Sequence, residues 1–94
     1  MKALDELCEM VRRLDGERSD LTVRLCALAN DVAGWESGRW PFEDTDGGFG
    51  PYWLREMIMK RVWTLEAICQ AKGYPDMASE LVAMESYFLA LLEP

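Results

Sequence analysis

The spacing of the apolar residues over the first 35 positions constrains the fold of this chain more than any other feature. The series steps by three and four residues and is interrupted once, at Arg18; its members are Leu4, Leu7, Val11, Leu14, Leu21, Leu25, Leu28, Val32 and Trp35. This is the a/d pattern of a heptad, which is typical of an amphipathic helix or a coiled coil. A strand is excluded because its side chains repeat every two residues.

The same series leaves open whether the N-terminal segment is one helix or two. The Asp-Gly pair at 15–16 favours a turn, and Ser19 suits the N-cap of a new helix. The a/d phase nevertheless continues past this point, whereas a loop usually resets it. We therefore expect one helix over 2–35, about 50 Å long. A break near 16–19, which would give a helical hairpin, is the alternative.

Residues 36–50 are expected to form a loop. The segment contains four glycines and one proline, which disfavour regular structure. It also places aromatic residues beside acidic ones, in the order Glu-Ser-Gly-Arg-Trp-Pro-Phe-Glu-Asp-Thr-Asp. Long loops in compact domains are often functional, so this acidic-aromatic loop is a candidate for binding another protein.

Two further helices are expected in the second half of the chain. Pro51 suits a first helical turn, and an apolar stripe at helical spacing follows it as far as Cys69. Gly73 suits the end of this helix, and Pro75 starts another whose apolar residues step by four and three. We expect helices over 51–72 and 76–92, joined as a helix-turn-helix hairpin.

Together these segments predict a single all-α domain over 1–94, built as a three- or four-helix bundle. A long N-terminal helix would extend past the hairpin and leave apolar residues uncovered. A second copy of the chain would cover them, so we expect a homodimer. The candidate dimer interface consists of Leu4, Leu7, Val11, Leu14, Arg18, Leu21, Leu25 and Leu28. With a break near Gly16, the chain would instead form a monomeric four-helix bundle.

The charge of the chain excludes several kinds of partner. The 94 residues have a formal net charge of −7. This argues against direct contact with nucleic acid or anionic membranes, because both bind clustered Lys and Arg, and it favours a protein partner with a basic surface. No apolar run reaches the ~18 residues of a membrane span. The charged start lacks a signal-peptide segment, so we expect a cytoplasmic protein.

Residue types suited to catalysis or metal binding are scarce. The chain has no histidine, which removes the commonest general base and metal ligand. The three cysteines are widely spaced without a Cys-x-x-Cys pair, which argues against a zinc site and a disulfide framework. The segment 44–47 begins like a calcium loop, but Gly48 and Arg55 occupy two of the ligand positions. We expect no metal, no cofactor and no enzymatic activity.

Acidic residues gather in two parts of the chain, and they define the candidate partner-binding site. Residues 36–50 carry four acids and one base, and residues 73–94 carry four acids and no base. Aromatic side chains supply contact area, and the acids around them supply steering and register. The candidates are Glu36, Trp40, Phe42, Glu43, Asp44, Asp46, Asp76, Glu80 and Glu85.

In size, acidity and lack of a catalytic set, the chain resembles the small phage-borne inhibitors of bacterial defence called anti-CRISPR proteins. The residues that carry the likeness are Glu36, Glu43, Asp44, Asp46, Asp76, Glu80, Glu85 and Glu93. The resemblance implies a non-enzymatic inhibitor in the bacterial host cytoplasm. Its partner would be a subunit of a CRISPR effector complex, whose basic nucleic-acid-binding surface it would block.

The alternative function is a helical dimeric adaptor, a small chaperone or an assembly subunit. The two functions predict different sensitive positions. The inhibitor would lose binding when the acids at 43, 44 and 46, or those of the last helix, are reversed in charge. The adaptor would lose its function when Leu21, Leu25 or Leu28 is made polar.

Overall fold

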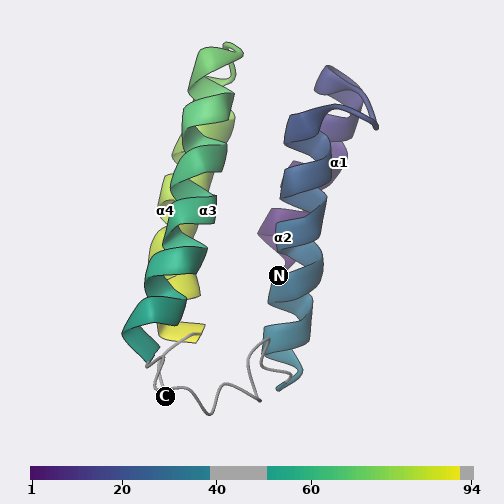
Figure 1. Cartoon of the computed structure of the whole chain (residues 1–94). Helices are drawn as coiled ribbons and strands as arrows, with labels where there is room; N and C mark the ends of the chain where they lie inside the picture. Colours follow the sequence, from purple (N-terminus) through teal and green to yellow (C-terminus); the bar gives the residue numbers. More distant parts are fainter. Residues whose placement is uncertain (39–50, 92–94) are drawn as a thin grey trace.

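The chain folds into a bundle of helical hairpins. The computed structural model describes residues 1–38 and 51–91, and within them the elements are α1 (Lys2–Asp15), α2 (Asp20–Glu36), α3 (Pro51–Ala71) and α4 (Pro75–Leu91). α1 packs on α2 and α3 on α4, and the two hairpins lie side by side (Figure 1). The predicted all-α fold is confirmed. The bounds of α3 and α4 lie within one residue of the expected 51–72 and 76–92.

The N-terminal segment reverses direction at Gly16, so the expected continuous helix over 2–35 is wrong and the hairpin alternative is correct. Gly16 has a φ of 92°, a left-handed conformation that favours glycine and ends a helix. Periodicity did not reveal the turn because Leu14 and Leu21, on its two sides, are seven residues apart, one heptad. Arg18, which interrupts the apolar series, lies exposed in this turn.

Ser19 caps the second helix, as the sequence predicted. Its side-chain oxygen accepts a hydrogen bond from the backbone N–H of Thr22 at 3.1 Å. The Thr22 hydroxyl in turn donates to the carbonyl oxygen of Gly16 at 2.6 Å. Thr22 is 1% exposed, so this bond satisfies a buried hydroxyl and also joins the two sides of the turn.

Replacing Ser19 with alanine is expected to lower the free energy of unfolding by about 1 kcal/mol, because the first turn of α2 loses its side-chain acceptor. Ser86, an exposed serine within α4, supplies the control. Ser86→Ala is expected to leave stability unchanged or slightly higher, because alanine favours a helix interior. Urea denaturation followed by circular dichroism measures both variants, and equal losses would show that the cap contributes nothing.

The core is formed by apolar side chains from all four helices. Those less than 2% exposed include Leu4, Leu7, Val11, Leu21, Leu25, Leu28, Val32, Val62, Leu81 and Phe88. The expected dimer interface therefore needs correction, because most of its residues are buried inside one chain, where a second copy cannot reach them. The residues of that set that stay exposed are Leu14 and Arg18.

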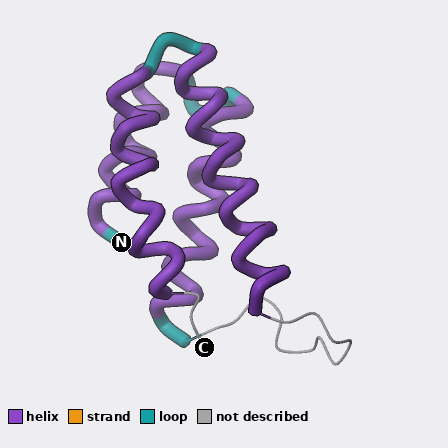
Figure 2. The backbone as a smooth tube through the Cα atoms, turned by 90° about the vertical axis from the view of Figure 1, so that its left-hand side faces the viewer, coloured by secondary structure: helices purple, strands orange, loops and turns teal. Residues whose placement is uncertain are grey.

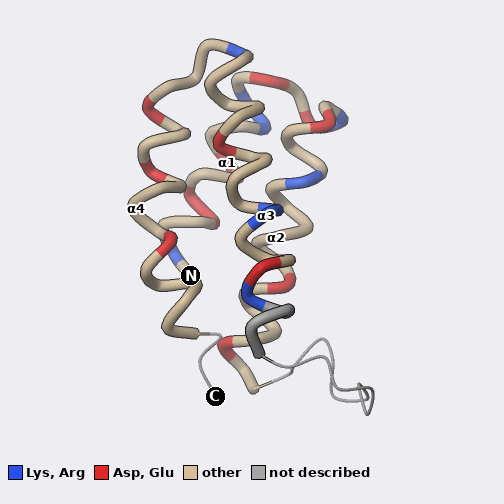
Figure 3. Tube along the Cα trace, turned by 60° about the vertical axis from the view of Figure 1, so that its left-hand side comes forward, with Lys and Arg blue, Asp and Glu red and all other residues tan. Residues whose placement is uncertain are grey.

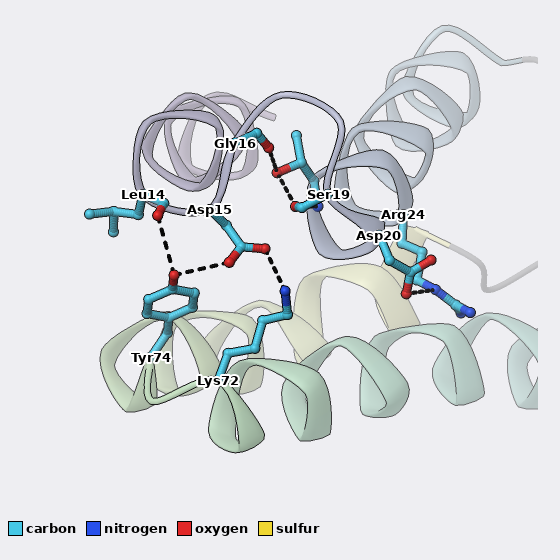
Figure 4. Close-up of polar contacts among 9 residues, drawn as sticks. Leu14, Asp15, Gly16, Ser19, Asp20, Arg24, Lys72 and Tyr74 are labelled. Atoms are coloured by element: carbon cyan, nitrogen blue, oxygen red, sulfur yellow. Dashed lines mark hydrogen bonds and ion pairs between the residues drawn. The ribbon is translucent and has the colours of Figure 1, made fainter.

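A polar cluster joins the two hairpins where their turns meet. Figure 2 shows both turns at the same end of the bundle. Asp15, the last residue of α1, accepts hydrogen bonds from Lys72 Nζ at 2.8 Å and from the Tyr74 hydroxyl at 3.0 Å (Figure 4). The hydrogen bond from Lys72, followed by that from Ser19, lowers the pKa of the Asp15 carboxyl. The cluster thus holds the α1–α2 turn against the α3–α4 turn.

Candidate functional site

The structure places some of the predicted partner-binding residues and not others. Outside the described residues lie Trp40, Phe42, Glu43, Asp44 and Asp46. The rest are Glu36, at the end of α2, and three acids on α4, namely Asp76, Glu80 and Glu85. The candidate site is therefore built on α4.

Glu36 is engaged within the bundle. One of its carboxylate oxygens accepts a hydrogen bond from the N-terminal amine of Met1 at 2.6 Å, and the other accepts one from the Tyr87 hydroxyl. The bond from the N-terminus, and then that from Tyr87, lowers the pKa of the Glu36 carboxyl. Glu36 thus links the start of α1 and the last turns of α4 to the end of α2, which is a structural role.

The α4 helix carries acidic residues and no basic one (Figure 3). Asp76 and Glu80 are exposed, and Glu85 is half-buried. Asp76 also lies in the first helical turn, where the helix dipole favours a carboxylate. Within residues 1–38 and 51–91, none of these three acids forms an ion pair with Lys or Arg. The charges of the two exposed acids, Asp76 and Glu80, are therefore available to a partner.

A hollow of about 360 Å³ lies between α4 and α1. Glu80 lines it from α4, and Glu6 and Met10 line it from α1. Met10 is 40% exposed, and Leu14, one turn further along α1, is 58% exposed. This side of α4 therefore combines acidic groups with uncovered apolar surface.

A second hollow, of about 430 Å³, lies on the side of α4 that faces α3. Its lining includes Trp63, Glu66 and Gln70 from α3 and Ser79 and Val82 from α4. Trp63 is 50% exposed and Val82 is 52% exposed. The indole Nε1–H of Trp63 donates to Glu85 Oε1 at 3.4 Å, which links the ring to the acidic helix.

Glu66 is a candidate that the sequence analysis missed. Burial, followed by a hydrogen bond with Glu85 and repulsion by its charge, raises the pKa of the Glu66 carboxyl from 4.5 to about 7. Among the described residues no donor faces its buried Oε2 atom. Two carboxyl groups can hydrogen-bond only if one is protonated, so the pair shares a proton below this pKa. The sequence contained one signal for this residue, which is helical spacing. Glu66 is four residues after Val62 and three before Cys69, both in the core, so it lies on the same side of α3 as they do.

Basic residues line a different hollow, of about 330 Å³, between α2 and α3, and acidic neighbours pair with them. The ion pairs there are Arg24 with Asp20 at 2.8 Å, Lys60 with Glu56 at 3.4 Å, and Arg61 with Asp31 at 2.8 Å. Positive charge is thus neutralised locally on this side of the bundle. Negative charge on α4 is not.

The described part of the chain shows no site for a metal or a membrane span. No group of three His, Cys, Asp or Glu side chains in it is placed to hold a metal ion. The cysteines are free thiols, and Cys8 and Cys69 are buried. No helix in these ranges is long and apolar enough to cross a membrane. Comparison of the chain with protein-family models, curated proteins and solved structures gives no match.

Proposed function

We propose that this chain is a non-enzymatic protein-binding inhibitor that blocks the basic nucleic-acid-binding surface of its partner. The observation that carries the proposal is the acidic surface of α4, where Asp76, Glu80 and Glu85 have no basic neighbour on the helix and no ion pair within the described ranges. Carboxylates spaced along a helix can take the positions of phosphates against Lys and Arg. A subunit of a CRISPR effector complex is the partner that the resemblance implies.

The apolar residues beside α4 support binding to a protein. Met10 and Leu14 are exposed on the α1 side of this helix, and Trp63 and Val82 are exposed on the α3 side. Interfaces place such side chains at their centre and charged groups around them, because apolar burial supplies affinity while charges supply steering and register. Here the acidic helix lies between two apolar strips, so the order is reversed, but both kinds of side chain still lie beside each other.

Reversing the charge of α4 tests the proposal. The double variant Asp76→Lys and Glu80→Lys is expected to stay folded, because both side chains are exposed. We expect it to lose at least tenfold in affinity for the partner, because attraction becomes repulsion at two positions. The measurement is affinity capture from bacterial lysate at two salt concentrations, with mass spectrometry of the bound proteins and elution by double-stranded DNA.

The matched control reverses two exposed acids away from α4, in Glu17→Lys and Glu56→Lys. The proposal expects the native chain and this control to retain a nucleic-acid-binding protein that DNA elutes, and the α4 variant to release it. Retention of the same proteins by all three forms, or capture that DNA does not displace, would contradict the proposed function.

A further inference from the structure

The hollow between α3 and α4 is lined by Glu66 and Trp63, and Glu85, which is not part of the lining, lies next to both of them. Glu66 presents a buried Oε2 atom with no donor among the described residues, and Glu85 lies next to it. Two carboxylates side by side are stable only when a proton or another cation lies between them. Beside the pair, half of the Trp63 side chain is exposed. A cation, an aromatic ring and two carboxylates form a complementary set, of which the described residues supply all but the cation.

We propose that this hollow receives one arginine side chain of the partner, with its guanidinium against the Trp63 indole and its N–H groups donating to Glu66 and Glu85. The inference rests on the proposed function, because a surface that binds phosphates is rich in arginine. It goes further by naming the side chain that is bound and the residues that bind it.

Arginine fits this hollow better than lysine for three reasons. A planar guanidinium stacks on an indole and still presents donors at its edge, whereas an ammonium is a strongly hydrated point charge. Its fork of N–H groups can reach two carboxyl groups at once. Its aliphatic stem would pack on Val82, which lines the hollow and is 52% exposed.

Binding of the cation should release the shared proton. The pKa of Glu66 is about 7, with burial and then Glu85 as its causes. On α3 the titratable neighbour is Cys69, whose own pKa is raised, first by burial and then by Asp15 at the end of α1 and by Glu66. That thiol therefore stays neutral between pH 6 and 8 and adds no charge beside the carboxyl pair in this range. For one proton with this pKa, arginine binding should be about tenfold weaker at pH 6 than at pH 8.

The test is a titration of the full-length, ¹⁵N-labelled chain with a blocked pentapeptide containing one arginine between glycines. Two matched peptides carry citrulline, which keeps the shape without the charge, or lysine. The signal is the indole N–H resonance of Trp63, assigned from its loss in Trp63→Phe. The variant Glu66→Gln removes the charge, and Glu56→Gln makes the same change at an exposed position of α3.

The inference expects a saturable shift of the Trp63 signal with the arginine peptide, a weaker one with lysine and none with citrulline. It also expects about tenfold weaker binding at pH 6 than at pH 8, with this pH dependence lost in Glu66→Gln and kept in Glu56→Gln. Equal shifts with citrulline, or unchanged binding by Glu66→Gln, would overturn it.

The outcome is separable from that of the proposed function. If the α4 reversal releases the captured partner while arginine leaves the Trp63 signal unmoved, the proposed function stands and the arginine site is wrong. If arginine binds as expected while the α4 reversal changes nothing in partner capture, the hollow binds arginine and the proposed function is wrong.

Discussion

Leu25→Asn is expected to unfold the chain, and Leu14→Asn to leave it folded. Both leucines belong to the same heptad series, but Leu25 is 0% exposed and Leu14 is 58% exposed. Truncating a buried leucine costs about 2–5 kcal/mol, and a buried amide without partners adds about 1–3 kcal/mol. The sum is comparable to the whole stability of a small domain, about 5–15 kcal/mol. A polar residue at an exposed position changes stability by only about 0.5 kcal/mol.

Thermal unfolding followed by circular dichroism, with light scattering for molecular mass, measures both variants. The pair also tests the homodimer that the sequence suggested. The homodimer would be supported if the native chain is a dimer, Leu14→Asn makes it dissociate and Leu25→Asn still folds. The heptad series would then form contacts between two chains. Polar changes at Leu21, Leu25 and Leu28 act through folding, so a loss of function in these variants does not distinguish an adaptor from an inhibitor. The sequence had suggested that they would make this distinction.

Glu66→Gln is expected to stabilise the chain at pH 8 by about 2 kcal/mol and to have almost no effect at pH 4, which lies below the unfolded-state pKa. Folding raises the pKa of this carboxyl from 4.5 to about 7. Between these two values the folded state keeps a proton that the unfolded state gives up, so the native chain loses stability as the pH rises from 4.5 to about 7 and stays at that lower level above it. The full difference between the folded and unfolded pKa of Glu66 converts to about 3 kcal/mol. We expect less because water screens part of this half-buried side chain.

The measurement is urea denaturation of the native chain, Glu66→Gln and Glu56→Gln at pH 4, 6 and 8. Glutamine imitates the protonated acid, so the native chain and Glu66→Gln should nearly agree at pH 4, diverge as the pH rises from 4.5 to about 7, and differ by a constant amount above that. Glu56→Gln should follow the native chain at each pH to within about 0.5 kcal/mol. A Glu66→Gln curve parallel to the native one would show that Glu66 titrates as an ordinary exposed carboxyl.

The expected effect of Glu66→Gln on stability also bears on the proposed arginine site. The same substitution that stabilises the chain at pH 8 is expected to weaken arginine binding. A pair of carboxyl groups that costs stability when ionised is the kind of local conflict that binding sites retain, because relieving it removes the function.

The candidate site was predictable in part. The acids of α4 were identified from the sequence because residues 73–94 contain four acids and no base, which needs no structure to count. Glu66 was missed because its property depends on Glu85, which is 19 positions away in the chain and on another helix. The two hollows were missed for the same reason, since each is formed between helices rather than within one.

The sequence by itself determined that this chain is helical, most of the residues that face the core, and where α3 and α4 begin and end to within one residue. Those properties follow from local periodicity, proline and glycine, which act within a few residues. Tertiary structure alone decided that the first 36 residues fold back on themselves at Gly16, because a turn that preserves the heptad count leaves the periodicity unchanged. It also decided that the leucines expected to join two chains lie inside one, and that Glu66 and Glu85 meet. Each of these depends on which helices become neighbours, and that is settled by burial of apolar surface across the whole chain.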